Sequence, residues 1–379
     1  MKKTTKNNYT IMALLTILGT SCGNETEQSP EWKLLETDTL QASVETEPVS
    51  APVDEDAADD PALWINFSNP AASFVIGSNK KAGIHVYDLQ GHEKTFAPIG
   101  DINNVDVRYR FPMGDRTIDL VGGSNRSHNT LSLLEIHPVT GELTQLDHDS
   151  LVSGVSEVYG FCFYHSKATG QHYAFINGKD GTIEQWKLEA AGDSAITGSV
   201  VRSLTLDSQP EGMVADDING ILFAGEEERG IWKFPAEPGS SSEGTFIPNS
   251  GEENPAIRFD IEGITLYSQN DTSGYLIASS QGNNSFAVFD RQEPHAYITS
   301  FTIDPGEIDG AEETDGIDIT NVGLNDTFPA GVFVVQDGFN YDGEKKMSQN
   351  FKLVDVRRMI YLVNPDESLA PDYIPYNLD

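Results

Sequence analysis

Short stretches of alternating apolar and polar residues recur along the chain, and polar turns separate them. Alternation with a period of two residues predicts β-strands, and no long segment shows a helical period. The strongest stretches begin roughly every 50 residues, a spacing typical of propeller blades. They are residues 60–65, 104–109, 159–164, 211–216, 262–267 and 315–320. The pattern predicts an all-β protein, a six-bladed β-propeller. A β-sandwich is the alternative fold, but it would not explain the period.

Each repeat continues with a second strand, and the turn after that strand carries polar residues. The first three repeats have a cation in this turn: Lys80, Arg126 and Lys179. The last three have acids and amides, with Glu227 in the fourth and Gln281 in the fifth. Equivalent positions of a propeller lie at one end of the central channel. We therefore expect one face with a basic half and an acidic half.

The overall charge limits the choice of ligand. The formal net charge is −35, from 59 acidic and 24 basic residues, which argues against a nucleic-acid partner. A polyanionic substrate would need bound divalent cations, which are often the largest local charges in a site. Acidic residues gather near the repeat starts, and they are Asp59, Asp60, Asp106, Glu211, Asp260, Glu262, Asp309 and Asp315. So many oxygen ligands favour Ca²⁺, whereas the few cysteines and histidines argue against zinc or copper.

The basic half is suited to phosphate. Arg126 offers a bidentate fork, and Lys80 and Lys179 offer point charges. Three cations at the same position of three consecutive repeats favour a binding role over a solvated surface. The Asp-Gly and Glu-Gly pairs at the repeat starts leave plain turn chemistry open as an alternative.

The N-terminus is typical of an exported protein. Basic residues precede a short apolar stretch, 11–18, which ends shortly before Cys22. Small residues before a cysteine resemble a bacterial lipoprotein signal, although ordinary secretion is the alternative. We expect a signal peptide over 1–21, a flexible tether over 22–52 and the propeller over 53–379. The mature protein would be a lipoprotein anchored through Cys22 in the periplasm or at the cell surface, and otherwise secreted.

Several ordered motifs resemble the bacterial β-propeller phytases, also called alkaline phytases. They include Asp59-Asp60-Pro61-Ala62-Leu63-Trp64, Asn103-Asn104-Val105-Asp106, Glu211-Gly212-Met213, Asp260-Ile261-Glu262-Gly263, Thr314-Asp315-Gly316 and Asn350-Phe351-Lys352. The matching stretches run from Asp56 to about Lys352. The resemblance implies a 3-phytase that binds several Ca²⁺ ions and hydrolyses inositol phosphates. We expect the protein to be a monomer and its substrate to be presented as calcium complexes.

The resemblance also implies roles for single residues. The metal ligands would be Asp60, Glu211, Glu227, Asp260, Glu262, Gln281, Asp309, Asp315 and Asn340. The phosphate contacts would be Lys80, Arg126, Tyr159 and Lys179. Glu211 and Glu227 would position the metals and an attacking water, and Tyr159 would hydrogen-bond the phosphate. Two rival functions stay open: a calcium-stabilised propeller that only binds partners, and a calcium propeller hydrolase of another class, such as a lactonase.

Overall fold

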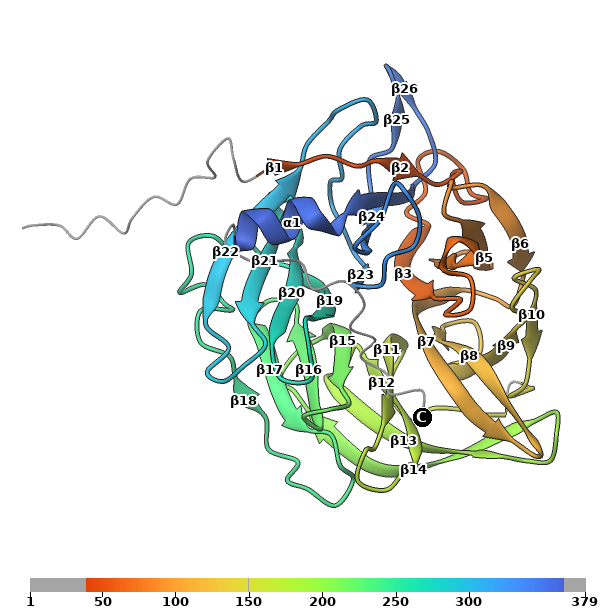
Figure 1. The fold of residues 1–379 in the computed structure, drawn as a ribbon. Coiled ribbons are helices and arrows are strands. Elements are labelled where there is room, and N and C mark those ends of the chain that lie inside the picture. Colours follow the sequence, from red (N-terminus) through yellow and green to blue (C-terminus); the bar gives the residue numbers. More distant parts are fainter. Residues whose placement is uncertain (1–38, 149, 365–379) are drawn as a thin grey trace, which may run out of the picture. The chain divides into compact units, whose positions relative to one another are not determined.

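The computed structural model describes residues 39–148 and 150–364, and their strands form six blades around a central channel (Figure 1). Each blade is an antiparallel sheet, named here from its innermost strand outward. Blade 1 consists of β3 Ala58–Trp64, β4 Phe74–Asn79, β5 Gly83–Asp88 and β6 Glu93–Ala97. Blade 2 consists of β7 Ile102–Met113, β8 Arg116–Asn125, β9 Thr130–Ile136 and β10 Leu143–Gln145. Blade 3 consists of β11 Val158–His165, β12 His172–Gly178, β13 Thr182–Ala190 and β14 Ile196–Thr205. The predicted six-bladed β-propeller is therefore confirmed, and every predicted repeat start falls at or beside an innermost strand.

The second half of the ring repeats this order. Blade 4 consists of β15 Pro210–Asp216, β16 Ile221–Glu226, β17 Gly230–Pro235 and β18 Thr245–Phe246. Blade 5 consists of β19 Ile261–Ser268, β20 Gly274–Ser280, β21 Ser285–Asp290 and β22 Tyr297–Ile303. Blade 6 consists of β23 Ile317–Thr320, β24 Val332–Asp337 and β27 Asn350–Asp355. A small hairpin, β25 Tyr341–Asp342 and β26 Lys345–Lys346, precedes β27. Two 3₁₀ turns, Pro70–Ala72 and Gln281–Asn283, lie in blades 1 and 5.

The core is divided among the interfaces between neighbouring blades. Ala62 and Trp64 of blade 1, for example, pack with Val105 and Val121 of blade 2. Comparable clusters join each other neighbouring pair, including blade 6 to blade 1. Central strands such as β4 and β24 are buried at every position, because blades cover both of their faces. This packing fixes the inner strands, and the inner strands carry the channel residues.

Strands from the beginning of the described chain complete the last two blades. β1 Thr39–Leu40 pairs in parallel with β22 of blade 5, and β2 Val44–Glu45 pairs antiparallel with β27 of blade 6. Leu40 and Val49 are buried there. Residues 39–52, which composition assigned to the tether, therefore belong to the propeller, because their apolar side chains complete its core. The rest of the predicted tether and the predicted signal peptide lie outside the described residues.

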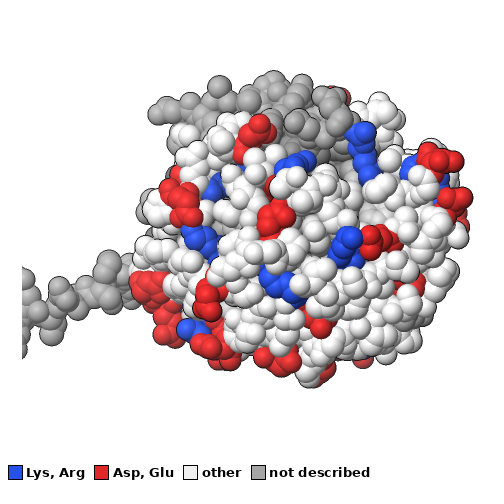
Figure 2. Space-filling model, turned by 90° about the horizontal axis from the view of Figure 1, so that it is seen from below, with Lys and Arg blue, Asp and Glu red and all other residues white. Residues whose placement is uncertain are grey.

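One short helix, α1 Val356–Val363, follows β27, and the sequence pattern did not predict it. The Asp355 side chain caps it by accepting a hydrogen bond from the Arg357 amide, and Met359 and Ile360 pack against blades 5 and 6. None of the helices in the described part of the chain has the length and apolar character needed to cross a membrane. Figure 2 shows Lys and Arg side chains interspersed with Asp and Glu on one side of the molecule.

Candidate active site

The first residue after the second strand occupies an equivalent place in each blade. These six residues, which we call the turn ring, are Lys80, Arg126, Lys179, Glu227, Gln281 and Gly338. In blades 1 to 5 the amide of this residue donates to a carbonyl just before the inner strand, as Lys80 does to Ala57 at 2.8 Å and Glu227 to Gln209 at 3.0 Å, and in blade 6 Gly338 donates to Glu312, further upstream of the inner strand. The predicted order of cations followed by acid and amide is therefore the order around one mouth of the channel.

A second ring lies where the inner strands begin. In blades 1 to 5 the pairing of the first and second strands is interrupted by a register shift that leaves two residues unpaired. Such bulges re-aim side chains and are frequent beside active sites. The first residue of each bulge, together with the equivalent residue of blade 6, forms what we call the bulge ring: Asp59, Asn103, Tyr159, Glu211, Glu262 and Asp315.

The second bulge position is glycine in blades 3 to 5 because neighbouring inner strands approach closely there. A Cβ atom on Gly160 would overlap the Glu211 carbonyl oxygen, and one on Gly212 would overlap the Glu262 carbonyl oxygen. Across the next interface, the amide of Gly263 donates to the Asp315 carbonyl at 2.5 Å. The Glu-Gly and Asp-Gly pairs are therefore sites of close approach between blades, which sets aside the turn alternative.

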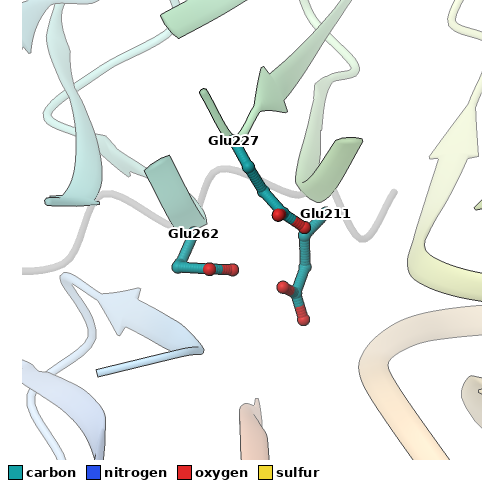
Figure 3. Close-up of side chains that lie close together, drawn as sticks. All are labelled: Glu211, Glu227 and Glu262. Atoms are coloured by element: carbon teal, nitrogen blue, oxygen red, sulfur yellow. The ribbon is translucent and has the colours of Figure 1, made fainter. Parts of the chain in front are cut away.

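Three glutamates converge at the mouth (Figure 3). Glu211 and Glu262 come from the bulge ring and Glu227 from the turn ring, and one carboxylate oxygen of each lies within 4.8 Å of the others. Glu211 and Glu262 are buried. Burial raises the pKa of Glu211 from 4.5 to about 8 and that of Glu227 from 4.5 to about 7. Burial and the neighbouring Glu211 also raise the pKa of Glu262 well above its usual value.

Few local donors compensate this cluster. The Gln209 amide donates to Glu227 Oε1 at 2.5 Å. Glu262 Oε2 is buried and has no hydrogen-bond partner among the described residues. Asp260 lies nearby, and its charge contributes to the raised pKa of Glu227. Three carboxylates with a buried, unsatisfied oxygen have the donor chemistry to hold a cation, because a buried charge of this kind is costly without a counter-charge.

Two cationic side chains, Arg126 of blade 2 and Lys179 of blade 3, lie near the glutamate cluster. The Lys179 ammonium lies 4.6 Å and the Arg126 guanidinium 5.8 Å from the centre of the Tyr159 ring. Among the described residues, neither cation forms an ion pair with a carboxylate, and both are partly exposed. The carboxylate of Glu211, followed by burial, raises the pKa of Tyr159, so its hydroxyl stays protonated and can donate a hydrogen bond. The structure thus brings these three predicted phosphate contacts together.

Lys80 has a different environment. Its ammonium forms ion pairs with Asp315 at 2.7 Å, Asp56 at 2.9 Å and Asp59 at 3.1 Å. The Gln281 amide donates to the other oxygen of Asp315 at 2.7 Å. Burial still raises the pKa of Asp315 to about 7. Lys80 therefore neutralises charge in the acidic half, and the phosphate role assigned to it stays a prediction.

The sequence alignment of the repeats was displaced by one residue in blades 1 and 2. It aligned Asp60 and Asn104 with Tyr159, whereas the bulges align Asp59 and Asn103 with it. Asp60 instead lies in the channel wall and accepts the Val105 amide at 3.0 Å. Burial and Asp59 raise its pKa well above the usual value. Asp59 and Asn103 are thus ring residues that the site prediction did not include.

Two of the predicted metal ligands belong to a separate cluster. Asp309 and Asn340 surround the fully buried ammonium of Lys352, with Asn340 Oδ1 at 3.3 Å. Glu45 of β2 at 2.6 Å and Asp337 at 3.3 Å complete the group. The cluster joins the N-terminal strand β2 to blade 6. It holds more acids than cations, and its metal-binding role stays a prediction.

The fold and the two rings define a β-propeller with a cluster of three carboxylates near two basic side chains that form no ion pair with a described carboxylate. The sequence matches the family described as Phytase over residues 8–377. The 3-phytase of Bacillus subtilis (strain 168) is 44% identical over 320 residues, 83% of this chain and 83% of the relative. The chain belongs to the phytase family. Among solved structures, a luciferin-regenerating enzyme matches with a TM-score of 0.51 at 10% identity, over 81% of this chain and 94% of that one, which shows a shared fold only.

Proposed function

We propose that the protein is a calcium-dependent phytase, a monomer that hydrolyses phosphate monoesters of myo-inositol hexakisphosphate presented as its calcium complexes. The observation that carries the proposal is the proximity of the two halves of the site, close enough that the charges of one shift pKa values in the other. Glu211, Glu227 and Glu262 could together hold a cation. Arg126 and Lys179, which form no ion pair with a described carboxylate, flank Tyr159, and the charges of these three glutamates act on the Tyr159 hydroxyl. The 3-phytase relative supports phytate as the substrate.

The donor set supports calcium as the metal. All of the groups at the cluster offer oxygen: the three glutamates and, beside Glu227, Asp260. Calcium takes six to eight such ligands, with flexible geometry. The raised pKa values of Glu211 and Glu227 describe carboxylates without a counter-ion, and a divalent cation would lower them again.

The bound calcium ions would act as Lewis acids, activating a water and shielding the phosphate charge. The chain's own residues would do the rest. Arg126 and Lys179 bind the phosphate oxygens and stabilise the charge that develops on them, and Tyr159 donates its hydroxyl proton in a hydrogen bond. Lys80 keeps Asp59 and Asp315 in place through its ion pairs. The attacking water would be oriented by Glu211 and Glu227.

Export of the protein is part of the proposal. The basic N-terminus, the apolar stretch 11–18 and Cys22 support a lipoprotein signal, with the domain held outside the cytoplasm. Mass spectrometry of the mature N-terminus tests this: a diacylated or triacylated Cys22 is expected. An unmodified N-terminus at another residue would indicate that the protein is secreted and is not a lipoprotein.

The direct test of the reaction is phosphate release from phytate by the purified protein, with calcium and with a chelator. Release that requires calcium is expected. A protein that binds calcium but hydrolyses neither phytate nor a simple phosphomonoester would be a binding module. A protein that opens lactones but releases no phosphate would belong to another hydrolase class.

A further inference from the structure

One member of the bulge ring has no role so far. Five of the six positions carry a carboxylate or a phenol, whereas blade 2 carries the amide of Asn103. Its side chain is fully buried, with 0% of its surface exposed. A buried amide at this position needs partners, since unsatisfied polar groups are costly in a protein interior.

Asn103 contacts both halves of the site. Its Nδ2 donates to Glu211 Oε1 at 2.8 Å and lies 3.3 Å from Asp59 Oδ1. Its Oδ1 accepts a hydrogen bond from Arg126 Nη1 at 3.2 Å. Glu211 belongs to blade 4 and Asp59 to blade 1, so a single side chain links three blades. One end faces the carboxylates and the other faces the guanidinium.

The amide of Asn103 meets the requirements of both neighbours. A carboxylate needs a donor and a guanidinium needs an acceptor, and the amide supplies one of each. Rotation of the amide by half a turn would place an oxygen against Glu211 and an NH₂ group against Arg126. Both contacts would then be repulsive, so the orientation of the amide is fixed by its neighbours. Aspartate would keep the acceptor and lose the donor, and leucine would lose both.

We propose that Asn103 is a positioning residue that couples the metal-holding carboxylates to the phosphate-holding cations. By fixing Glu211 and Arg126 through one rigid group, it sets the distance between the cation site and the phosphate contact. The proposal rests on the proposed function, because that function assigns metal binding to the carboxylates and phosphate binding to the cations. The bridge itself is a structural link that can be measured without any turnover.

The test compares Asn103→Leu and Asn103→Asp with a matched control, Asn321→Leu. Asn321 is also a buried amide, but it donates to the Ser268 carbonyl and lies among residues at the other end of the inner strands. The readouts are kcat and KM for phytate, the calcium concentration for half-maximal activity, and the Tm with calcium and with inorganic phosphate.

Asn103→Leu should lower kcat/KM by about 10- to 100-fold, the loss expected when hydrogen bonds to charged groups disappear. It should also weaken the rise in Tm caused by calcium and by phosphate. Asn103→Asp keeps the acceptor for Arg126, so its KM should stay within about threefold of the wild type. Its added charge beside Glu211 and Asp59 should lower the calcium-free Tm and enlarge the calcium-induced rise. Asn321→Leu should lower Tm but leave the other readouts unchanged.

The inference is overturned if Asn103→Leu alters kcat/KM and the calcium and phosphate responses no more than Asn321→Leu does. It is also overturned if Asn103→Asp and Asn103→Leu behave alike in every readout. Failure of the proposed function looks different: the wild type itself would release no phosphate. The two Tm responses would then still support or refute the bridge.

Discussion

Substitutions in the two halves of the site should have different effects: a change in the basic half should lower kcat/KM, and a change in the acidic half should raise the calcium requirement. Lys179 and Glu227 occupy the same turn position in adjacent blades, so Lys179→Met and Glu227→Gln are matched perturbations of nearly conserved size. Lys179 has no carboxylate partner among the described residues and contacts the Tyr159 ring at 4.6 Å. Its loss should therefore remove a phosphate contact without disturbing the carboxylates.

The magnitude follows from the contacts. A hydrogen bond to a charged group is worth about 1.5–3 kcal/mol. Since about 1.4 kcal/mol corresponds to a factor of ten, Lys179→Met should lower kcat/KM by roughly 10- to 100-fold. Its calcium concentration for half-maximal activity should stay the same or fall, because a cation near the metal is gone. Glu227→Gln removes one of three charged ligands, and that concentration should rise by about tenfold or more.

The assay is phytate hydrolysis over a calcium titration, with thermal melting over the same concentrations. The reasoning is refuted if Lys179→Met raises the calcium requirement as strongly as Glu227→Gln, or if neither variant affects hydrolysis.

Three further outcomes are expected. Chelation should lower activity and Tm together, because a metal that binds only the folded state stabilises it; unchanged melting in a chelator would contradict this. Without calcium, Tm should fall as pH rises from about 4.5 to 8. The raised pKa values of Glu211 and Glu227 (about 8 and about 7) mean that the folded state keeps protons which the unfolded chain releases, and a flat profile would argue against that burial. Gly160→Ala should lower the free energy of unfolding by about 1–3 kcal/mol, measured by urea denaturation, because its Cβ would overlap the Glu211 carbonyl; a neutral effect would refute the close approach of blades 3 and 4.

The sequence predicted the ring of blades and the turn ring well, because both follow from local pattern. Strands with a period of two and a repeated spacing define the blades. The turn residues come directly after strands, so Lys179 and Glu227 fall at equivalent places without any knowledge of packing. Tyr159, Glu211 and Glu262 were also found, because each precedes a glycine at a repeat start.

The bulge ring was predicted less well, for a physical reason. A bulge leaves two adjacent residues unpaired, and the sequence does not say which of them faces the channel mouth. Where the second residue is glycine the choice is clear. In blades 1 and 2 the pairs are Asp59-Asp60 and Asn103-Asn104, so either residue fits, and the prediction chose Asp60.

Long-range pairing was the other limit. Nothing local to Lys80 indicates that it forms ion pairs with Asp56, Asp59 and Asp315, residues from both ends of the propeller sequence. The same holds for Lys352, whose contacts with Asp309 and Asn340 place these two residues in a cluster with Glu45 and Asp337. The two-residue strands β1 and β2 were missed because their pairing partners are more than 250 residues away, for example Thr302 for Thr39.

The most direct test of the account is a crystal structure of the protein grown with calcium and inorganic phosphate, with anomalous scattering used to identify the calcium ions. We expect calcium ligated by Glu211, Glu227 and Glu262, and a phosphate that contacts that calcium together with Arg126 and Lys179. Calcium absent from these three glutamates at a concentration that activates the enzyme, or phosphate bound away from both cations, would contradict the account.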